Sequence, residues 1–161
     1  MEAIVAVFSD WGIGSEGTQQ VVLKADRRHF RELTDGAAVL VGRRTLGDFP
    51  GGRPLKGRHN IVLTRQAVEI EGAEVVHSEA EAAEAAKAYP RCLVIGGASV
   101  YRQTIDKADR LALTLIEDTP AQADAFFPEY SDWKVVHQES HEADERHAHA
   151  YKFVDLERLK K

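Results

Sequence analysis

The sequence predicts a three-layer α/β fold, in which a mainly parallel central sheet is closed at one edge by a C-terminal antiparallel hairpin. Three observations lead to this prediction. Short, almost continuously apolar runs recur along the chain, which is typical of strands covered on both faces. Helical patterns separate these runs, as crossover helices separate parallel strands. The C-terminal part differs, because two strand-like segments there flank a polar turn.

The individual elements follow from the same patterns. In chain order, the strand-like runs are AIVAVF (3–8), AAVLVG (37–42), NIVLT (60–64), EVVH (74–77), CLVIG (92–96) and RLALTLI (110–116). Helical patterns lie at about residues 24–34, 43–48, 78–88 and 98–107, and the two strands of the hairpin at 133–143 and 147–157. In the third helix, Ser78 is a suitable N-cap and Glu81 completes a capping box. The glycine- and proline-containing segment 49–60 is interpreted as a loop.

Length, charge and cysteine content limit the function classes. The chain has 161 residues, which predicts one domain that spans 1–161. Cys92 is the one cysteine, so a disulfide-stapled secreted scaffold is excluded. The formal net charge of −5 provides no global basic field for nucleic acid. There is no basic N-terminal stretch and no segment of membrane-spanning length. We therefore expect a cytoplasmic monomer without a nucleic-acid or membrane partner.

Asp26 is the first candidate for a functional side chain. Together with Leu23, Phe30 and Leu33 it recurs at a spacing that puts all four near one stripe of the predicted helix. A carboxylate on an apolar stripe is costly unless it is paired or protonated, which favours a functional role. The alternative is a first-turn aspartate that interacts with the helix dipole.

Two strand-to-helix turns are candidates for binding an anion. In VLVGRRTLGDF (39–49), a strand ends at a glycine and two arginines open the next helix. In CLVIGGASVY (92–101), two adjacent glycines remove side chains where the backbone approaches something closely. Each turn also has a structural interpretation, as a solvated basic turn or as a tight connection. Parallel sheets bind ligands at the carboxyl ends of their strands, so two such turns together favour a ligand site there.

At these residues the chain resembles the dihydrofolate reductase family along nearly its whole length. The matching landmarks are AIVAV followed by Asp10 and Ile13-Gly14, LKAD with Phe30, VGRRT, RPLKGRHNIVLT, VIGGASVY, LTLI, FPEY and the closing HAHAYKF. The order and spacing of these short motifs are together specific. The resemblance implies hydride transfer from NADPH to C6 of dihydrofolate with protonation at N5, for which a water completes the proton path.

The resemblance also assigns the substrate side of the site. Asp26 matches the acidic residue that binds the pterin ring and supports protonation, and the Thr114 hydroxyl would steady it by hydrogen bonding. Arg58 matches the arginine that pairs with the α-carboxylate of the glutamate tail, a role that suits its planar fork. The remaining residues of the pterin pocket and its wall are Ile4, Arg27, Phe30, Phe49, Arg53 and Ile95.

The cofactor side is assigned in the same way. The residues that match the nicotinamide side are Ala6, Ile13 and Gly14. Those that match the pyrophosphate contacts are Arg44, Thr45, Gly97, Ala98, Ser99 and Val100, with Gly42, Gly96 and Tyr101 beside them. Around the expected 2′-phosphate and adenosine stand Arg43, Leu63, Thr64, Arg65 and His77. Two arginines there favour NADPH over NADH, because a phosphate needs charge that a bare ribose does not.

The chain departs from the family pattern just before and after Asp26. Val21 stands where most bacterial relatives carry a tryptophan, and Lys24 where they carry a proline. Arg27 replaces a usually apolar wall residue, and either faces solvent or stacks beside the aminobenzoyl ring. These changes concern rate and inhibitor preference more than the class of reaction.

Three alternatives remain at this point. One is a reductase of the same fold that acts on a ribosylated pyrimidine in flavin biosynthesis, and another is an NADPH-binding module without catalysis. A metal site at His141, His147 and His149 is the third, but two histidines on one strand with no cysteine are too few for a closed site. We expect no bound metal.

Overall fold

The computed structural model describes residues 1–8, 12–14, 24–47, 52–116, 125–126, 133–142 and 151–158. Within these ranges the side chains of residues 8, 12–14, 24–27, 107, 116, 125–126 and 158 are not part of the description.

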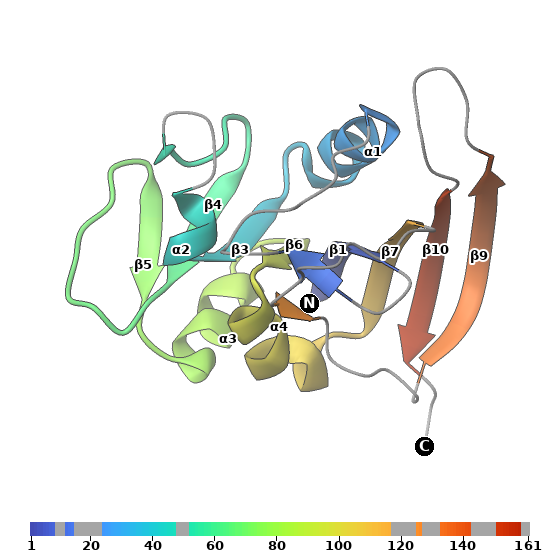
Figure 1. Ribbon diagram of the computed structural model, residues 1–161. Helices are drawn as coiled ribbons and strands as arrows, with labels where there is room; N and C mark the ends of the chain where they lie inside the picture. Colours follow the sequence, from blue (N-terminus) through green and yellow to red (C-terminus); the bar gives the residue numbers. More distant parts are fainter. Residues whose placement is uncertain are drawn as a thin grey trace.

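An eight-stranded mixed sheet forms the centre of the protein (Figure 1). Its strands are β1 (Glu2–Phe8), β3 (Ala38–Gly42), β4 (His59–Leu63), β5 (Ala73–Val76), β6 (Cys92–Gly96), β7 (Arg110–Ile116), β9 (Trp133–His141) and β10 (Tyr151–Arg158). They are ordered β5-β4-β3-β6-β1-β7-β10-β9. All pairs from β5 to β7 are parallel, whereas β10 is antiparallel to both β7 and β9. The predicted parallel sheet with a C-terminal hairpin at its edge is confirmed.

Helices cover both faces of this sheet (Figure 1). The helices are α1 (Lys24–Thr34), α2 (Arg43–Leu46), α3 (Glu79–Lys87) and α4 (Ala98–Thr104), which continues into a 3₁₀ turn, η2 (Ile105–Lys107). On one face, Phe30 and Leu33 of α1 pack against Ile4 and Leu93. On the other face, α3 and α4 pack against the alternate residues of the same strands, such as Val5 and Val94. These three layers are the predicted architecture.

Most predicted boundaries agree with the structure to within one residue. The helix at 24–34 and the strands at 92–96 and 110–116 are confirmed at both ends. The predicted helix at 43–48 is shorter, because α2 ends at Leu46 and Gly47 caps it with a backbone bond to Arg43. The Ser78 hydroxyl accepts a hydrogen bond from the Glu81 amide at 3.1 Å, as the capping prediction requires. The Glu81 carboxylate, however, accepts from the amide of His77 and not from that of Ser78.

A second, two-stranded sheet was not predicted. It pairs β2 (Gly12–Gly14) with β8 (Ala125–Phe126) in antiparallel fashion. Two or three residues are too few to produce a recognisable apolar pattern. Among the described residues, no helix is long and apolar enough to cross a membrane.

Candidate functional site

The two glycine-containing turns lie side by side at the carboxyl edge of the sheet. Strands β3 and β6 are paired in parallel, with Val41 opposite Gly96. Since α2 begins directly after β3 and α4 directly after β6, the two helix starts meet at this edge. The fold therefore brings together the two candidate anion-binding segments, which are about fifty residues apart in sequence.

Backbone and side chains approach each other unusually closely between these turns. A Cβ on Gly42 would lie 3.0 Å from Cγ2 of Val100, and a Cβ on Gly97 only 2.9 Å from Oγ1 of Thr45. The peptide bond between Gly96 and Gly97 is cis, and Gly96 has a φ of 138°, which side chains rarely adopt. Glycine is therefore required by the close packing of the two turns, in which Gly42 and Gly96 are buried.

A polar cluster adjoins the α2 turn. Strands β3, β4 and β5 end together, so the residues that follow them, Arg43, Thr64 and His77, are neighbours. Arg43 donates a hydrogen bond from Nη1 to the side-chain oxygen of Gln66, and the backbone N–H of Gln66 donates to Oγ1 of Thr64 at 3.2 Å. Nδ1 of the His77 ring forms a hydrogen bond with the carbonyl oxygen of Thr64 at 2.9 Å. Arg65 is exposed within the same segment. The sequence predictions found all of these residues except Gln66, whose only signal was its place directly after Arg65.

On the face covered by α1, an apolar wall lies next to the carboxyl edge. Ile4 of β1 is 6% exposed and packs with Phe30 and Ile95, so the fold brings together three of the residues that were assigned to the pterin pocket and its wall. The hydroxyl of buried Tyr101 donates to the Ile4 carbonyl at 2.7 Å and fixes the backbone of β1 from the opposite face. Thr114 of β7 lies opposite Ala6 of β1 and is 2% exposed.

The position of Asp26 is fixed by α1. It is the third residue of the helix and precedes Phe30 by four residues, so both occupy the same face of α1. Phe30 is packed against the sheet, and this places the backbone of Asp26 at the end of α1 closest to the carboxyl edge. The side chains of Asp26 and Arg27 lie outside the described residues.

Arg58 is joined to the other end of α1. Its Nε donates to Oγ1 of Thr34 at 3.2 Å, and its Nη1 donates to the carbonyl of Lys56 at 2.7 Å. Thr34 is fully buried and in turn donates to the Phe30 carbonyl at 2.8 Å. The guanidinium is thus oriented by two acceptors and is only partly buried.

Asn60 holds the segment that carries Arg58. Its buried amide side chain accepts from the amide of Leu55 at 3.0 Å and donates to the carbonyls of Leu55 and Arg58 at 2.9 and 3.1 Å. All three bonds are made to the backbone of the loop, which they close into a fixed shape. This positioning role of Asn60 was not predicted, although the asparagine belongs to the RPLKGRHN motif.

The remaining predicted residues are distributed as follows. Ala98 and Ser99 begin α4, and the Ser99 hydroxyl accepts from Gln103 at 3.1 Å. Arg44 and Arg53 are exposed, whereas Leu63 is buried. Ile13 and Gly14 are described only as backbone of β2. Phe49 and the histidines 147 and 149 lie outside the described residues.

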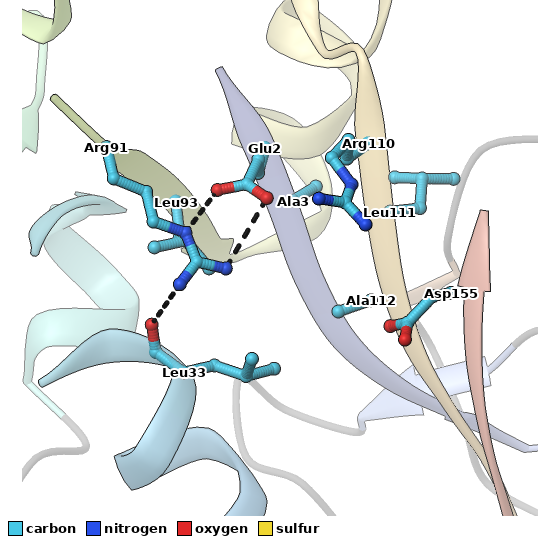
Figure 2. Close-up of a pocket in the computed structure, with 9 residues that line it drawn as sticks. All are labelled: Glu2, Ala3, Leu33, Arg91, Leu93, Arg110, Leu111, Ala112 and Asp155. Carbon is cyan, nitrogen blue, oxygen red and sulfur yellow. Dashed lines mark hydrogen bonds and ion pairs between the residues drawn. The ribbon is translucent and has the colours of Figure 1, made fainter. Parts of the chain in front are cut away.

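One further cavity lies at the opposite edge of the sheet (Figure 2). It has a volume of about 190 Å³ and carries the charged side chains of Glu2, Arg91, Arg110 and Asp155. Arg91 donates from Nε to the Glu2 carboxylate and from Nη1 to the Leu33 carbonyl at 3.2 Å. Because the cavity lies at the amino ends of the parallel strands, it is separate from the candidate site.

The comparisons with known proteins agree on one family. Residues 1–158 match the family model described as dihydrofolate reductase. Dihydrofolate reductase type 3 of Salmonella typhimurium is 37% identical over 149 residues, which are 91% of this chain and 90% of that protein. Dihydrofolate reductase of Haemophilus influenzae is 36% identical over 157 residues, 96% of each chain. A solved structure of dihydrofolate reductase from Enterococcus faecalis, complexed with NADP(H) and RAB-propyl, superimposes with a TM-score of 0.90 at 33% identity and covers 99% of this chain and 96% of that chain.

Proposed function

The chain belongs to the dihydrofolate reductase family, and from this premise we propose how its own residues carry out the NADPH-dependent reduction of 7,8-dihydrofolate to 5,6,7,8-tetrahydrofolate. The observation that carries the proposal is the juxtaposition of the Gly42 and Gly97 turns at the carboxyl edge of the sheet. The amino-terminal end of α1, which bears Asp26, points to the same edge of the sheet. The full-length match to dihydrofolate reductases favours this function over the pyrimidine reductase of flavin biosynthesis.

The two turns fit the pyrophosphate of NADPH. A Cβ atom at Gly97 or Gly42 would lie 2.9 or 3.0 Å from Thr45 or Val100, so only glycine lets the two turns pack this closely. This packing brings the starts of α2 and α4 together, where backbone amides are available to an anion. Arg44 and Thr45 stand at the start of α2 and Ser99 at the start of α4, where they supply charge and hydroxyl donors. When bound, NADPH supplies the hydride that reduces the pterin.

The polar cluster at the ends of β3, β4 and β5 fits the 2′-phosphate. Arg43 and Arg65 supply the positive charge there, and Thr64 supplies a hydroxyl. The bond from Arg43 to Gln66 restricts the guanidinium before a ligand arrives, so less rotamer freedom is lost on binding. This charge is the physical basis for a preference for NADPH over NADH.

The substrate extends along α1. Thr34 follows Asp26 by eight residues, which at about 1.5 Å per residue separates the two by about 12 Å along the helix axis. Asp26 at one end binds the pterin, and Arg58, which is held by Thr34 at the other end, pairs with the α-carboxylate of the glutamate tail. The helix therefore sets the distance between the two polar ends that an elongated folate must span.

Asp26 and Thr114 carry the proton chemistry in this proposal. The carboxylate binds the pterin ring and supports protonation at N5, and the buried Thr114 hydroxyl on β7 holds the carboxylate in place. A water delivers the proton, since no other acidic side chain was assigned to this pocket. Ile4, Phe30 and Ile95 line the pterin pocket and exclude bulk solvent.

The departures before and after Asp26 modify this site without changing its reaction. Val21 lacks the indole donor, Lys24 removes the proline at the helix entry, and Arg27 puts a charge beside the pocket. We attribute to them an altered rate and altered affinity for antifolates. We further propose that the chain acts in the cytoplasm as a monomeric single domain.

The test is oxidation of NADPH by the purified protein in the presence of dihydrofolate, followed at 340 nm. We expect folate-dependent oxidation that an antifolate suppresses. If NADPH binds but dihydrofolate produces no oxidation above a control without enzyme, the chain is a cofactor-binding module and the proposal is wrong.

A further inference from the structure

A ring stack joins α1 to the C-terminal strand. The imidazole of His29 lies over the ring of Phe153 in β10, with ring centroids 4.1 Å apart and an interplanar angle of 16°. Both side chains are half-buried. The contact bridges residues more than a hundred positions apart and connects the helix that bears Asp26 to the sheet.

Phe153 is itself held in place by its neighbours. It packs edge-on against Tyr151 and His141, at 5.5 and 5.6 Å between ring centroids. Tyr151 and His141 stack on each other at 4.9 Å and 12°. The surface that receives His29 is therefore a fixed aromatic cluster on β9 and β10 and not a single mobile ring.

This cluster adjoins the catalytic part of the proposed site. Phe153 lies directly opposite Thr114 in the antiparallel register of β10 and β7, and Thr114 lies opposite Ala6 of β1. Ala6, Thr114 and Phe153 thus form a row across three neighbouring strands, from the proposed nicotinamide side to the ring that stacks on His29. Any shift of α1 relative to Phe153 is also a shift relative to Thr114.

The stack is also close to Asp26 along the helix. His29 follows Asp26 by three residues, which places the two on adjacent turns of the same side of α1. Phe30 packs against β1 and β6, whereas His29 packs against β10. Two contacts on different strands fix the rotation of a helix about its axis, which one contact alone does not.

The far end of α1 has separate attachments. Arg91 donates to the carbonyl of Leu33, and Arg58 donates to the hydroxyl of Thr34. These bonds hold the last turn of the helix, eight residues from Asp26. Among the described side chains of α1, those of His29 and Phe30 make the contacts with the sheet that lie nearest to the first turn.

From this arrangement we propose that His29 is a positioning residue for the reaction: by stacking on Phe153 it sets the rotation of the first turns of α1 and so the placement of Asp26 against Thr114. The inference rests on the role proposed above for Asp26. It adds a residue that contacts neither substrate nor cofactor.

The variants separate positioning from general stability. His29→Ala removes the ring, and His29→Phe keeps a flat ring that can stack in the same place. The matched control is the other histidine stack with a similar geometry, between His59 and Tyr89 at 4.3 Å and 26°, on β4 and after α3. Tyr89→Leu removes that stack and leaves the sequence next to Arg58 unchanged.

The readouts are the single-turnover rate of NADPH oxidation at saturating dihydrofolate and the Kd of NADPH. Single turnover is needed because product release often limits kcat. We expect His29→Ala to slow single turnover about tenfold, because small misplacements of a reacting group have effects of this size or larger. We expect its Kd for NADPH to stay within about twofold of the parent, since the cofactor residues lie on other elements. His29→Phe and Tyr89→Leu should both turn over within about twofold of the parent protein, since neither removes the stack on Phe153.

A double-variant experiment tests whether His29 acts through Asp26. In the Asp26→Asn background, His29→Ala should slow single turnover by less than about twofold, because the group that it positions is already gone. A full tenfold loss there overturns the proposal, as does an unchanged rate in His29→Ala or an equal loss in Tyr89→Leu. Failure of the proposed function looks different, since the parent protein itself would then not oxidise NADPH with dihydrofolate.

Discussion

Nε of Arg58 donates a hydrogen bond to Oγ1 of Thr34, so the loop before β4 is attached to the last turn of α1. Thr34 is fully buried and its hydroxyl also donates to the carbonyl of Phe30. One hydroxyl group therefore connects the proposed anchor of the glutamate tail to the helix that carries Asp26.

Replacement of Thr34 by valine tests this connection. Thr34→Val keeps the shape of the side chain but removes the acceptor of Arg58, so the guanidinium loses one of its two orienting bonds. We expect the KM for dihydrofolate to rise about tenfold or more, since one hydrogen bond to a charged group contributes about 1.5 kcal/mol or somewhat more. A dihydropterin without a glutamate tail serves as the control substrate, and its KM should not change. Equal increases for both substrates would contradict the role of Thr34 in orienting Arg58.

Removal of Arg43 and Arg65 tests the assignment of the 2′-phosphate. In Arg43→Ala/Arg65→Ala we expect the affinity for NADPH to fall about 100-fold or more, because two charge-assisted contacts are lost. The affinity for NADH, which lacks the phosphate, should change by no more than about twofold, and the exposed Arg102 of α4 provides a control as Arg102→Ala. Dissociation constants measured by fluorescence titration decide the question, and equal losses for the two cofactors would show that the phosphate binds elsewhere.

Asp26→Asn tests the catalytic carboxylate. The amide is nearly isosteric but does not support protonation of the pterin, so we expect kcat at neutral pH to fall by about 10² or more. Binding of NADPH, measured separately, should be retained. Asp35→Asn is a matched control, because Asp35 is an exposed aspartate just after the other end of α1. A kcat within threefold of the parent protein in Asp26→Asn would remove Asp26 from the mechanism.

The buried thiol of Cys92 makes stability depend on pH in the alkaline range. Burial raises the pKa of Cys92 from 9.0 to about 11 in the folded protein. Above pH 9 the unfolded chain loses the thiol proton and the folded protein retains it, so the free energy of unfolding falls between pH 9 and 11, by about 2–3 kcal/mol in total. Below pH 9 the thiol of Cys92 is protonated in both the folded and the unfolded state, so its contribution to the free energy of unfolding does not change with pH.

Urea denaturation of the parent protein and of Cys92→Ala at pH 8, 9, 10 and 11 measures this contribution. At pH 8 the alanine variant is less stable because it leaves a cavity, and the difference in the free energy of unfolding between the two proteins should narrow as the pH rises. A constant difference from pH 8 to 11 would show that Cys92 titrates equally in both states.

Local features of the fold were predictable from the sequence because they depend on local chemistry. Ser78 accepts from the amide three residues later, and the run CLVIG forms β6 over its whole length. The hairpin of β9 and β10 followed from two strand patterns around a polar turn. The order of the strands was not predictable by this reasoning, since no local pattern indicates that β1 lies between β6 and β7.

For the site, the sequence indicated which residues matter but not how they are held. The glycine turns and Arg58 were identified, yet their supports come from elsewhere in the chain. Tyr101 donates to the carbonyl of Ile4 across 97 positions, and Thr34 accepts from Arg58 across 24. Nothing in the sequence indicated that His29 has a role, because a histidine beside an apolar stripe has no distinctive pattern. Its contact with Phe153 on β10 becomes evident only in the structure.

The central place of β1 in the sheet has a consequence for the order in which the protein is made. The ribosome produces β1 first, but the strands that flank it are β6 and β7, which begin at Cys92 and Arg110. Until those segments have emerged, the apolar strand at residues 2–8 has no partner on either edge. The nascent chain therefore presents this strand unpaired until residues 92–116 have been made, and exposed strand edges of this kind favour aggregation. β10 is the last of these strands to be made, and its pairing with β7 can form only after both have emerged.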